Sequence, residues 1–72
     1  MNVYKYGVEI GSYVKGPKLI AYNSISCMME RYNPEFPSVA DNIIVCGHLE
    51  LLVDRDTYNE VYELYREWLQ RS

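Results

Sequence analysis

Three residues near the middle of the chain carry side chains that could hold a metal ion. Cys46, His48 and Glu50 alternate along an apolar segment, so on one strand they would stand in a column on the same face. A thiolate, an imidazole and a carboxylate can ligate zinc together, and Cys27 could supply a fourth ligand. Structural zinc sites usually use paired motifs, whereas this chain has a single Cys-x-His. We therefore interpret the column as a strand face packed under a helix, and we expect no metal and no cofactor.

A cysteine nucleophile is the second chemistry that these residues suggest. Either Cys27 or Cys46 could be activated by His48, the single histidine of the chain. No Gly-rich loop lies nearby to offer an oxyanion site, and cysteine is among the most buried residue types. We expect both cysteines to be structural and reduced, and the protein not to be an enzyme.

Two carboxylates flank Arg55 just before the last apolar segment. Asp54 and Asp56 at this spacing could bind a divalent cation. Acidic residues are also favoured at a helix N-terminus, where the backbone N–H groups and the helix dipole attract negative charge. We predict this second role, with Asp56 or Thr57 as the capping residue.

A basic segment with tyrosines on either side is a candidate binding surface. Lys15-Gly16-Pro17-Lys18 lies between Tyr13 and Tyr22, and basic and aromatic residues together bind single-stranded nucleic acid. Lysines on a hairpin edge also prevent sheets from joining edge to edge. Tyr13, Tyr22 and Tyr32 fall outside the strongest core patterns. The predicted partner-binding residues are Tyr13, Lys15, Lys18, Tyr22 and Tyr32.

The N-terminal third of the chain has the pattern of a β-hairpin. Apolar and polar residues alternate over residues 3–10, which is typical of a half-buried strand. The alternation changes phase at Gly11-Ser12, where a turn or bulge is needed. Gly16-Pro17 suits a tight reversal in which the glycine takes a positive φ. Residues 18–22 then form the returning strand.

The middle of the chain predicts a short helix followed by a long strand. Apolar residues repeat at helical spacing over residues 25–32, after two good N-caps and before Pro34. Residues 35–42 are expected to be an irregular connection. Residues 43–53 read as one strand with a buried face, in which Gly47 marks a bulge or a close contact with a helix.

The C-terminal segment predicts an amphipathic helix over residues 56–71. Its inner face would carry apolar residues at 3.6-residue spacing, and its outer face would be charged. The inner residues are Tyr58, Val61, Tyr62, Tyr65, Trp68 and Leu69. The predicted fold is therefore a small α+β domain of residues 1–72 in the order β-β-α-β-α. Its sheet has three or four mainly antiparallel strands, and two helices pack on one face.

Size and composition restrict the possible classes of protein. The chain has 72 residues, 49% hydrophobic and 24% charged, with a net charge of −3 and eight tyrosines. These values are typical of a globular domain with a small core, for which homodimerisation is one way to bury more surface. No segment is apolar enough to span a bilayer or to act as a signal peptide, so we expect a cytoplasmic protein without a membrane partner. The acidic charge disfavours general binding to phosphate backbones.

Size and character, rather than any motif, suggest the function. Compact acidic chains of this kind resemble the small regulators and inhibitors of phages and mobile elements, including anti-defence (anti-CRISPR-like) proteins that block host nucleases. That resemblance implies a non-enzymatic protein that binds a protein partner and acts by steric blocking. The alternative is a nucleic-acid or nucleotide-binding module that uses the basic, tyrosine-containing N-terminal hairpin.

Overall fold

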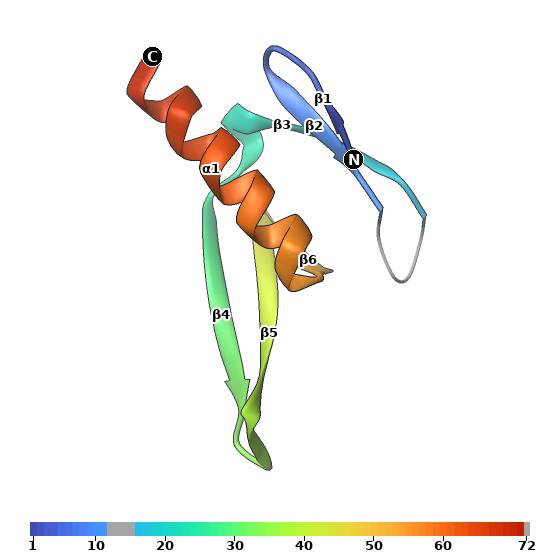
Figure 1. Cartoon of the computed structure of the whole chain (residues 1–72), viewed down its shortest axis with the longest axis vertical. Helices are drawn as coiled ribbons and strands as arrows, with labels where there is room; N and C mark the ends of the chain where they lie inside the picture. Colours follow the sequence, from blue (N-terminus) through green and yellow to red (C-terminus); the bar gives the residue numbers. More distant parts are fainter. Residues whose placement is uncertain (12–15, 72) are drawn as a thin grey trace.

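The described part of the chain folds into two small sheets and one α-helix. The computed structural model describes residues 1–11 and 16–71, which form six strands in two three-stranded antiparallel sheets and a single C-terminal helix (Figure 1). The predicted β-β-α-β-α order, with two helices packed on one sheet, is therefore wrong. The α+β character remains, but the only α-helix among the described residues is the C-terminal one, and a single 3-10 turn at Tyr22–Ser24 precedes the second sheet.

The first sheet has the strand order β1 (Asn2–Val3), β2 (Gly7–Ile10) and β3 (Lys18–Ala21). The single strand predicted for residues 3–10 is interrupted, because the backbone N–H of Tyr4 donates to the Gly7 carbonyl at 2.9 Å and closes a turn. The β2–β3 hairpin is confirmed, and Gly16 has the expected positive φ of 75°. The predicted change of phase at Ser12 lies outside the described residues.

The second sheet has the order β4 (Cys27–Asn33), β5 (Phe36–Cys46) and β6 (Leu49–Val53). Residues 25–32 were expected to form a helix, and this prediction is wrong. Met28 pairs with Ile44 and Met29 with Ile43, so these neighbouring methionines point to opposite faces of the sheet. Two adjacent apolar residues fit a strand with apolar neighbours on both faces as well as they fit a helix.

Two further predictions for the middle of the chain are also wrong. The segment expected to be irregular, residues 35–42, is mostly the first half of β5. The strand expected over residues 43–53 is two strands, because the chain reverses at Gly47-His48 between the paired residues Cys46 and Leu49. Gly47 has a φ of 62°, and no non-glycine residue in the described chain has a positive φ, which fits a type II′ turn.

The helix, α1 (Arg55–Arg71), agrees with the prediction within one residue. Its N-terminus is capped by Asp54, whose Oδ1 accepts the backbone N–H of Thr57 at 2.7 Å. Asp54 therefore takes the role that was assigned to Asp56 or Thr57. The outer face is charged, as expected, and carries two ion pairs, Glu63 with Arg66 at 3.3 Å and Glu67 with Arg71 at 3.9 Å.

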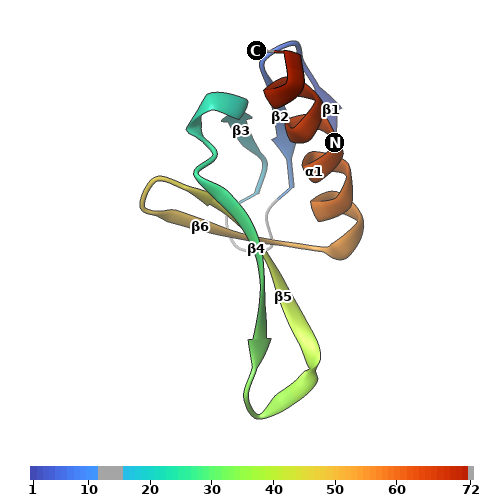
Figure 2. The same ribbon diagram turned by 90° about the vertical axis from the view of Figure 1, so that its left-hand side faces the viewer.

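One buried cluster joins both sheets and the helix. Side chains of the first sheet, the second sheet and α1 contact one another in it, and Figures 1 and 2 show α1 lying against the strands while the β4–β5 ribbon extends beyond it. The Tyr65 hydroxyl donates to the Ile25 carbonyl at 3.1 Å and ties α1 to the segment before β4. The cluster contains Val8, Ile10, Ile20, Tyr22, Ile25, Ile44, Leu51, Val53, Tyr58 and Val61. Within the described chain, no helix has the length and apolar character needed to cross a membrane.

Candidate functional site

The structure separates the three residues that were expected to form a column. Cys46 ends β5 beside the core, His48 is exposed in the following turn, and Glu50 lies on β6. Glu50 pairs with Val45 rather than Cys46, so its side chain lies on the opposite face of the sheet from Cys46. It forms an ion pair with Arg31 at 3.2 Å. In the described part of the chain, no three His, Cys, Asp or Glu residues are grouped so as to hold a metal ion.

The cysteines lack the surroundings of a nucleophile. Burial raises the pKa of the Cys46 thiol, and a hydrogen bond with Ser24 only partly opposes this effect. A raised pKa leaves little thiolate near neutral pH. Cys27 is exposed on β4 and lies opposite Val45. The two cysteines therefore lie on different faces of the second sheet.

Of the five residues predicted to bind a partner, the three that the structure describes do not form one surface. Tyr13 and Lys15 lie outside the described residues. Tyr22 is 3% exposed, and its ring centroid is 5.9 Å from that of Trp68, so it belongs to the core. Burial, together with the negative charge of Glu67, raises the pKa of its hydroxyl. Lys18 is partly exposed at the start of β3, whereas Tyr32 is exposed on β4 of the other sheet.

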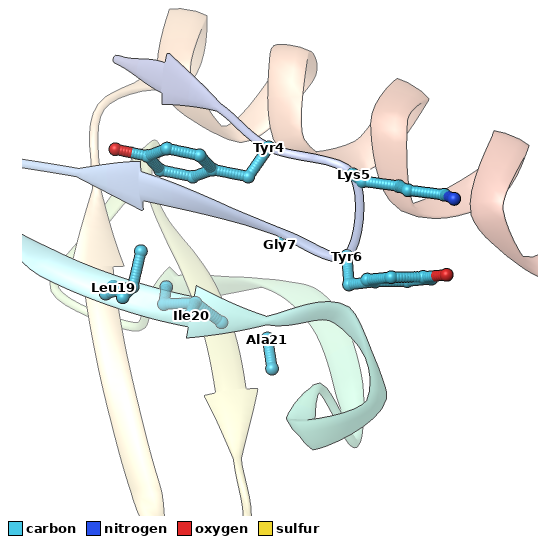
Figure 3. A pocket seen from close by; sticks show the side chains of 7 residues that line it. All are labelled: Tyr4, Lys5, Tyr6, Gly7, Leu19, Ile20 and Ala21. Carbon is cyan, nitrogen blue, oxygen red and sulfur yellow. The ribbon is translucent and has the colours of Figure 1, made fainter.

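The first sheet carries an apolar hollow on its outer face. Its walls include Tyr4, Tyr6 and Leu19, which are 50%, 66% and 72% exposed (Figure 3). The hollow has a volume of about 570 Å³, within the range of pockets that bind drug-sized ligands. Its lining residues come from the β1–β2 turn and from β2 and β3: Tyr4, Lys5, Tyr6, Gly7, Leu19, Ile20 and Ala21.

Local sequence explains why the hollow forms here. The turn at residues 4–7 brings Tyr4 and Tyr6 out of the strand alternation, so both rings are exposed while Val8 and Ile10 point into the core. Gly7 contributes no side chain, and a β-carbon at this position would lie 2.3 Å from the Ile20 carbonyl oxygen. The close approach of β2 to β3 therefore requires glycine, and its bare backbone leaves space between the surrounding side chains.

One cation lies beside the aromatic wall. The Lys5 ammonium is 5.3 Å from the centroid of the Tyr6 ring, within the range of a cation–π contact. On the same face, Glu9 accepts a hydrogen bond from the Asn2 side chain at 2.7 Å. The hollow thus offers aromatic and aliphatic surface, one ammonium group and two tyrosine hydroxyls. These groups can bind an apolar side chain or a flat ring.

Sequence reasoning missed this surface for a specific reason. Tyr4, Tyr6, Val8 and Ile10 alternate regularly, which suggested one buried strand face. The signal that could have revealed the turn is Gly7, because glycine is favoured at the fourth position of a type I turn. In the segment Tyr4-Lys5-Tyr6-Gly7, Gly7 occupies the fourth position. A turn predicted here would have placed both tyrosines on the surface.

Comparison with known proteins adds no family to these observations. Neither the protein-family models, the curated proteins nor the solved structures include a match to this chain.

Proposed function

We propose that this chain is a non-enzymatic interaction protein that binds a protein partner and regulates it by covering part of its surface. The observation that supports this most directly is the exposed hollow on the first sheet. Three large side chains at least half exposed around a concave apolar surface cost free energy in water, and such surfaces are common at binding sites.

The residue types of the hollow favour a protein partner. Tyrosine is enriched at interfaces because its ring supplies contact area while its hydroxyl stays hydrated. Tyr4, Tyr6 and Leu19 would act as the anchors, and Lys5 would orient an acidic group of the partner. Occupation of the partner's surface is a steric mode of action. In an anti-defence inhibitor, the covered surface would belong to a host nuclease.

A second candidate function is single-stranded nucleic-acid binding. The observation in its favour is the Lys5 ammonium over the Tyr6 ring, next to a second exposed tyrosine. Bases stack on such rings, and lysines contact phosphates. Residues 1–24 hold only three lysines, and Glu9 lies among them, so few phosphates could be neutralised. Retention on single-stranded DNA or RNA at physiological salt would favour this candidate.

The test of the main proposal is a pull-down with matched variants. The tagged chain is incubated with lysate of the source cell, with and without nuclease, and bound material is identified by mass spectrometry. We expect one protein in near-stoichiometric amount regardless of nuclease, lost with Leu19→Ser and kept with the control Leu52→Ser. Leu52 is also exposed but lies on the second sheet. Loss with Leu52→Ser alone, or recovery that depends on nucleic acid, would contradict the proposal.

A further inference from the structure

The outer edge of β3 carries backbone groups without partners in the described chain. The backbone N–H of Tyr22 donates to the Tyr6 carbonyl at 2.9 Å, and antiparallel strands alternate between hydrogen-bonded and non-bonded pairs. By this alternation, Ile20 and Lys18 bond to β2, whereas Leu19 and Ala21 direct their N–H and C=O groups away from it. The Ala21 carbonyl accepts the Ser24 hydroxyl at 2.7 Å. Among residues 1–11 and 16–71, the Leu19 N–H, the Leu19 C=O and the Ala21 N–H have no backbone partner and remain for another strand.

The other sheet edges are less suited to pairing. β1 has only two residues. β4 has a register shift between Tyr32 and Asn33, and its Glu30 and Arg31 are engaged in ion pairs with Arg55 and Glu50. Irregular and charged edges discourage added strands. β6 is the remaining edge of the second sheet, and it carries the charged Glu50.

The free groups of β3 lie directly beside the hollow. Leu19 and Ala21, the residues with outward-facing backbone groups, also line it. Side chains of an added strand alternate between the two faces of the sheet. Every second side chain of that strand would therefore lie on the outer face, where the apolar surface of Leu19, Tyr6 and Tyr4 is available (Figure 3).

Charge selects among the possible occupants. Residues 1–24 contain three lysines and one glutamate, whereas residues 25–72 contain four arginines and nine acidic residues. Lys18 lies on β3 itself, and Lys5 lies beside the hollow. This local positive charge attracts an acidic segment of a partner and repels a basic segment. It also disfavours pairing of two copies through β3, because each copy would bring Lys18 to the contact.

We propose that β3 binds an extended, acidic segment of the partner as an added strand, with one apolar side chain of that segment in the hollow. This inference rests on the proposed function and specifies its partner. Backbone hydrogen bonds to Leu19 and Ala21 supply affinity, and the hollow selects the side chain, as in other cases of strand addition. Acidic residues next to the anchor face Lys5 and Lys18.

The first experiment selects displayed peptides of random sequence for binding to the immobilised full-length chain. Peptides that also bind the Leu19→Ser variant are removed from the library beforehand. We expect enriched peptides to carry aromatic or aliphatic residues at alternate positions, flanked by Asp or Glu. Enrichment of proline-rich peptides, of apolar residues at helical spacing or of basic peptides would overturn the inference. So would the absence of any enrichment over the variant.

The second experiment tests the backbone contact itself. In a synthetic copy of the most enriched peptide, N-methylation of the amides that face β3 should weaken binding at least tenfold, and methylation of the intervening amides should not. Leu19→Pro removes the outward N–H at an edge position that tolerates proline, and it should have the same effect. If Leu19→Pro fails to fold, the methylated peptides decide alone. Equal effects of both methylation sets would overturn the inference.

The outcomes also separate this inference from the proposed function. Suppose that a protein partner is recovered and is lost with Leu19→Ser, but that N-methylation of the peptide backbone does not change binding. The proposed function would then stand, and strand addition would be contradicted. A dimer in gel filtration that Leu19→Pro dissociates would show that a second copy occupies the edge, and this result would also overturn the inference.

Discussion

At the scale of single residues, two positions stabilise local structure. Gly7 permits β2 to approach β3, and Asp54 caps the N-terminus of α1. Both can be tested with conservative variants, because each has a neighbouring position of the same residue type or a substitute of the same shape.

Gly7→Ala should destabilise the fold. Its β-carbon would meet the Ile20 carbonyl oxygen at 2.3 Å, so a strand must move, and such overpacking costs roughly 1–3 kcal/mol. Urea unfolding measures the loss. Gly11→Ala is the control, because no described atom lies within 4 Å of its β-carbon and its φ is not positive. Equal stability of the two variants would contradict the close approach of β2 and β3.

Asp54 should make stability depend on acid pH. Hydrogen bonds from the Thr57 side chain and backbone hold the pKa of Asp54 below its ordinary value near 4. A lowered folded-state pKa gives stability that is full above the unfolded-state pKa and is lost as pH falls through the folded-state pKa.

The matched variant for this prediction is Asp54→Asn, which still caps the helix but does not titrate. Below about pH 4, the wild type should lose stability faster than Asp54→Asn, whereas near pH 7 the two should be similar. Glu30, whose pKa is lowered mainly by its hydrogen bond with Arg55, titrates in both proteins and cancels in the comparison. Parallel pH profiles would contradict the capping role.

At the scale of elements, periodicity predicted the C-terminal helix and the β2–β3 hairpin but not the second sheet. The helix prediction succeeded because Tyr58 and Val61 belong to a stripe that continues to Leu69, about three turns, which few strands imitate. The segment of residues 25–32 has only two turns of such spacing. Its structure depends on pairing with β5, and a contact between distant parts of the chain leaves no local pattern.

The assignment of β4 as a strand has a direct spectroscopic test. Nuclear Overhauser contacts should join backbone protons of Met29 with Ile43, and of Ile43 with Leu52, because these residues are cross-strand partners. Contacts between residues three apart within residues 25–32 would instead indicate a helix and would contradict the second sheet.

The candidate site could be predicted less well than the fold, for a similar reason. Tyr22 looked like a boundary residue, yet its contact with Trp68, 46 residues away, buries it. Tyr4 and Tyr6 belong to the alternation that predicted a half-buried strand, yet the turn that closes at Gly7 exposes both of them. Exposure of a tyrosine depends on which elements pack over it, and the sequence near the tyrosine contains only part of that information.

At the scale of the whole molecule, the two sheets and the helix should unfold as one unit, because they share one buried cluster. Trp68 reports on this cluster, with the Tyr65 ring centroid at 6.1 Å. In urea, Trp68 fluorescence and far-ultraviolet circular dichroism should give the same midpoint. Ile20→Val in the first sheet and Ile44→Val in the second should each lower the free energy of unfolding by about 0.5–1.5 kcal/mol and move that midpoint to a lower urea concentration. Separate transitions for the two probes would show that the sheets unfold independently.

The most direct test of the binding account is amide hydrogen exchange along β3, measured for the free chain and with the recovered partner or selected peptide bound. The outward amides of Leu19 and Ala21 should exchange fast in the free chain and slow at least tenfold in the complex. The amides of Met29 and Leu52 on the second sheet should change little. Unchanged exchange at Leu19 and Ala21 in a saturated complex would contradict strand addition at β3.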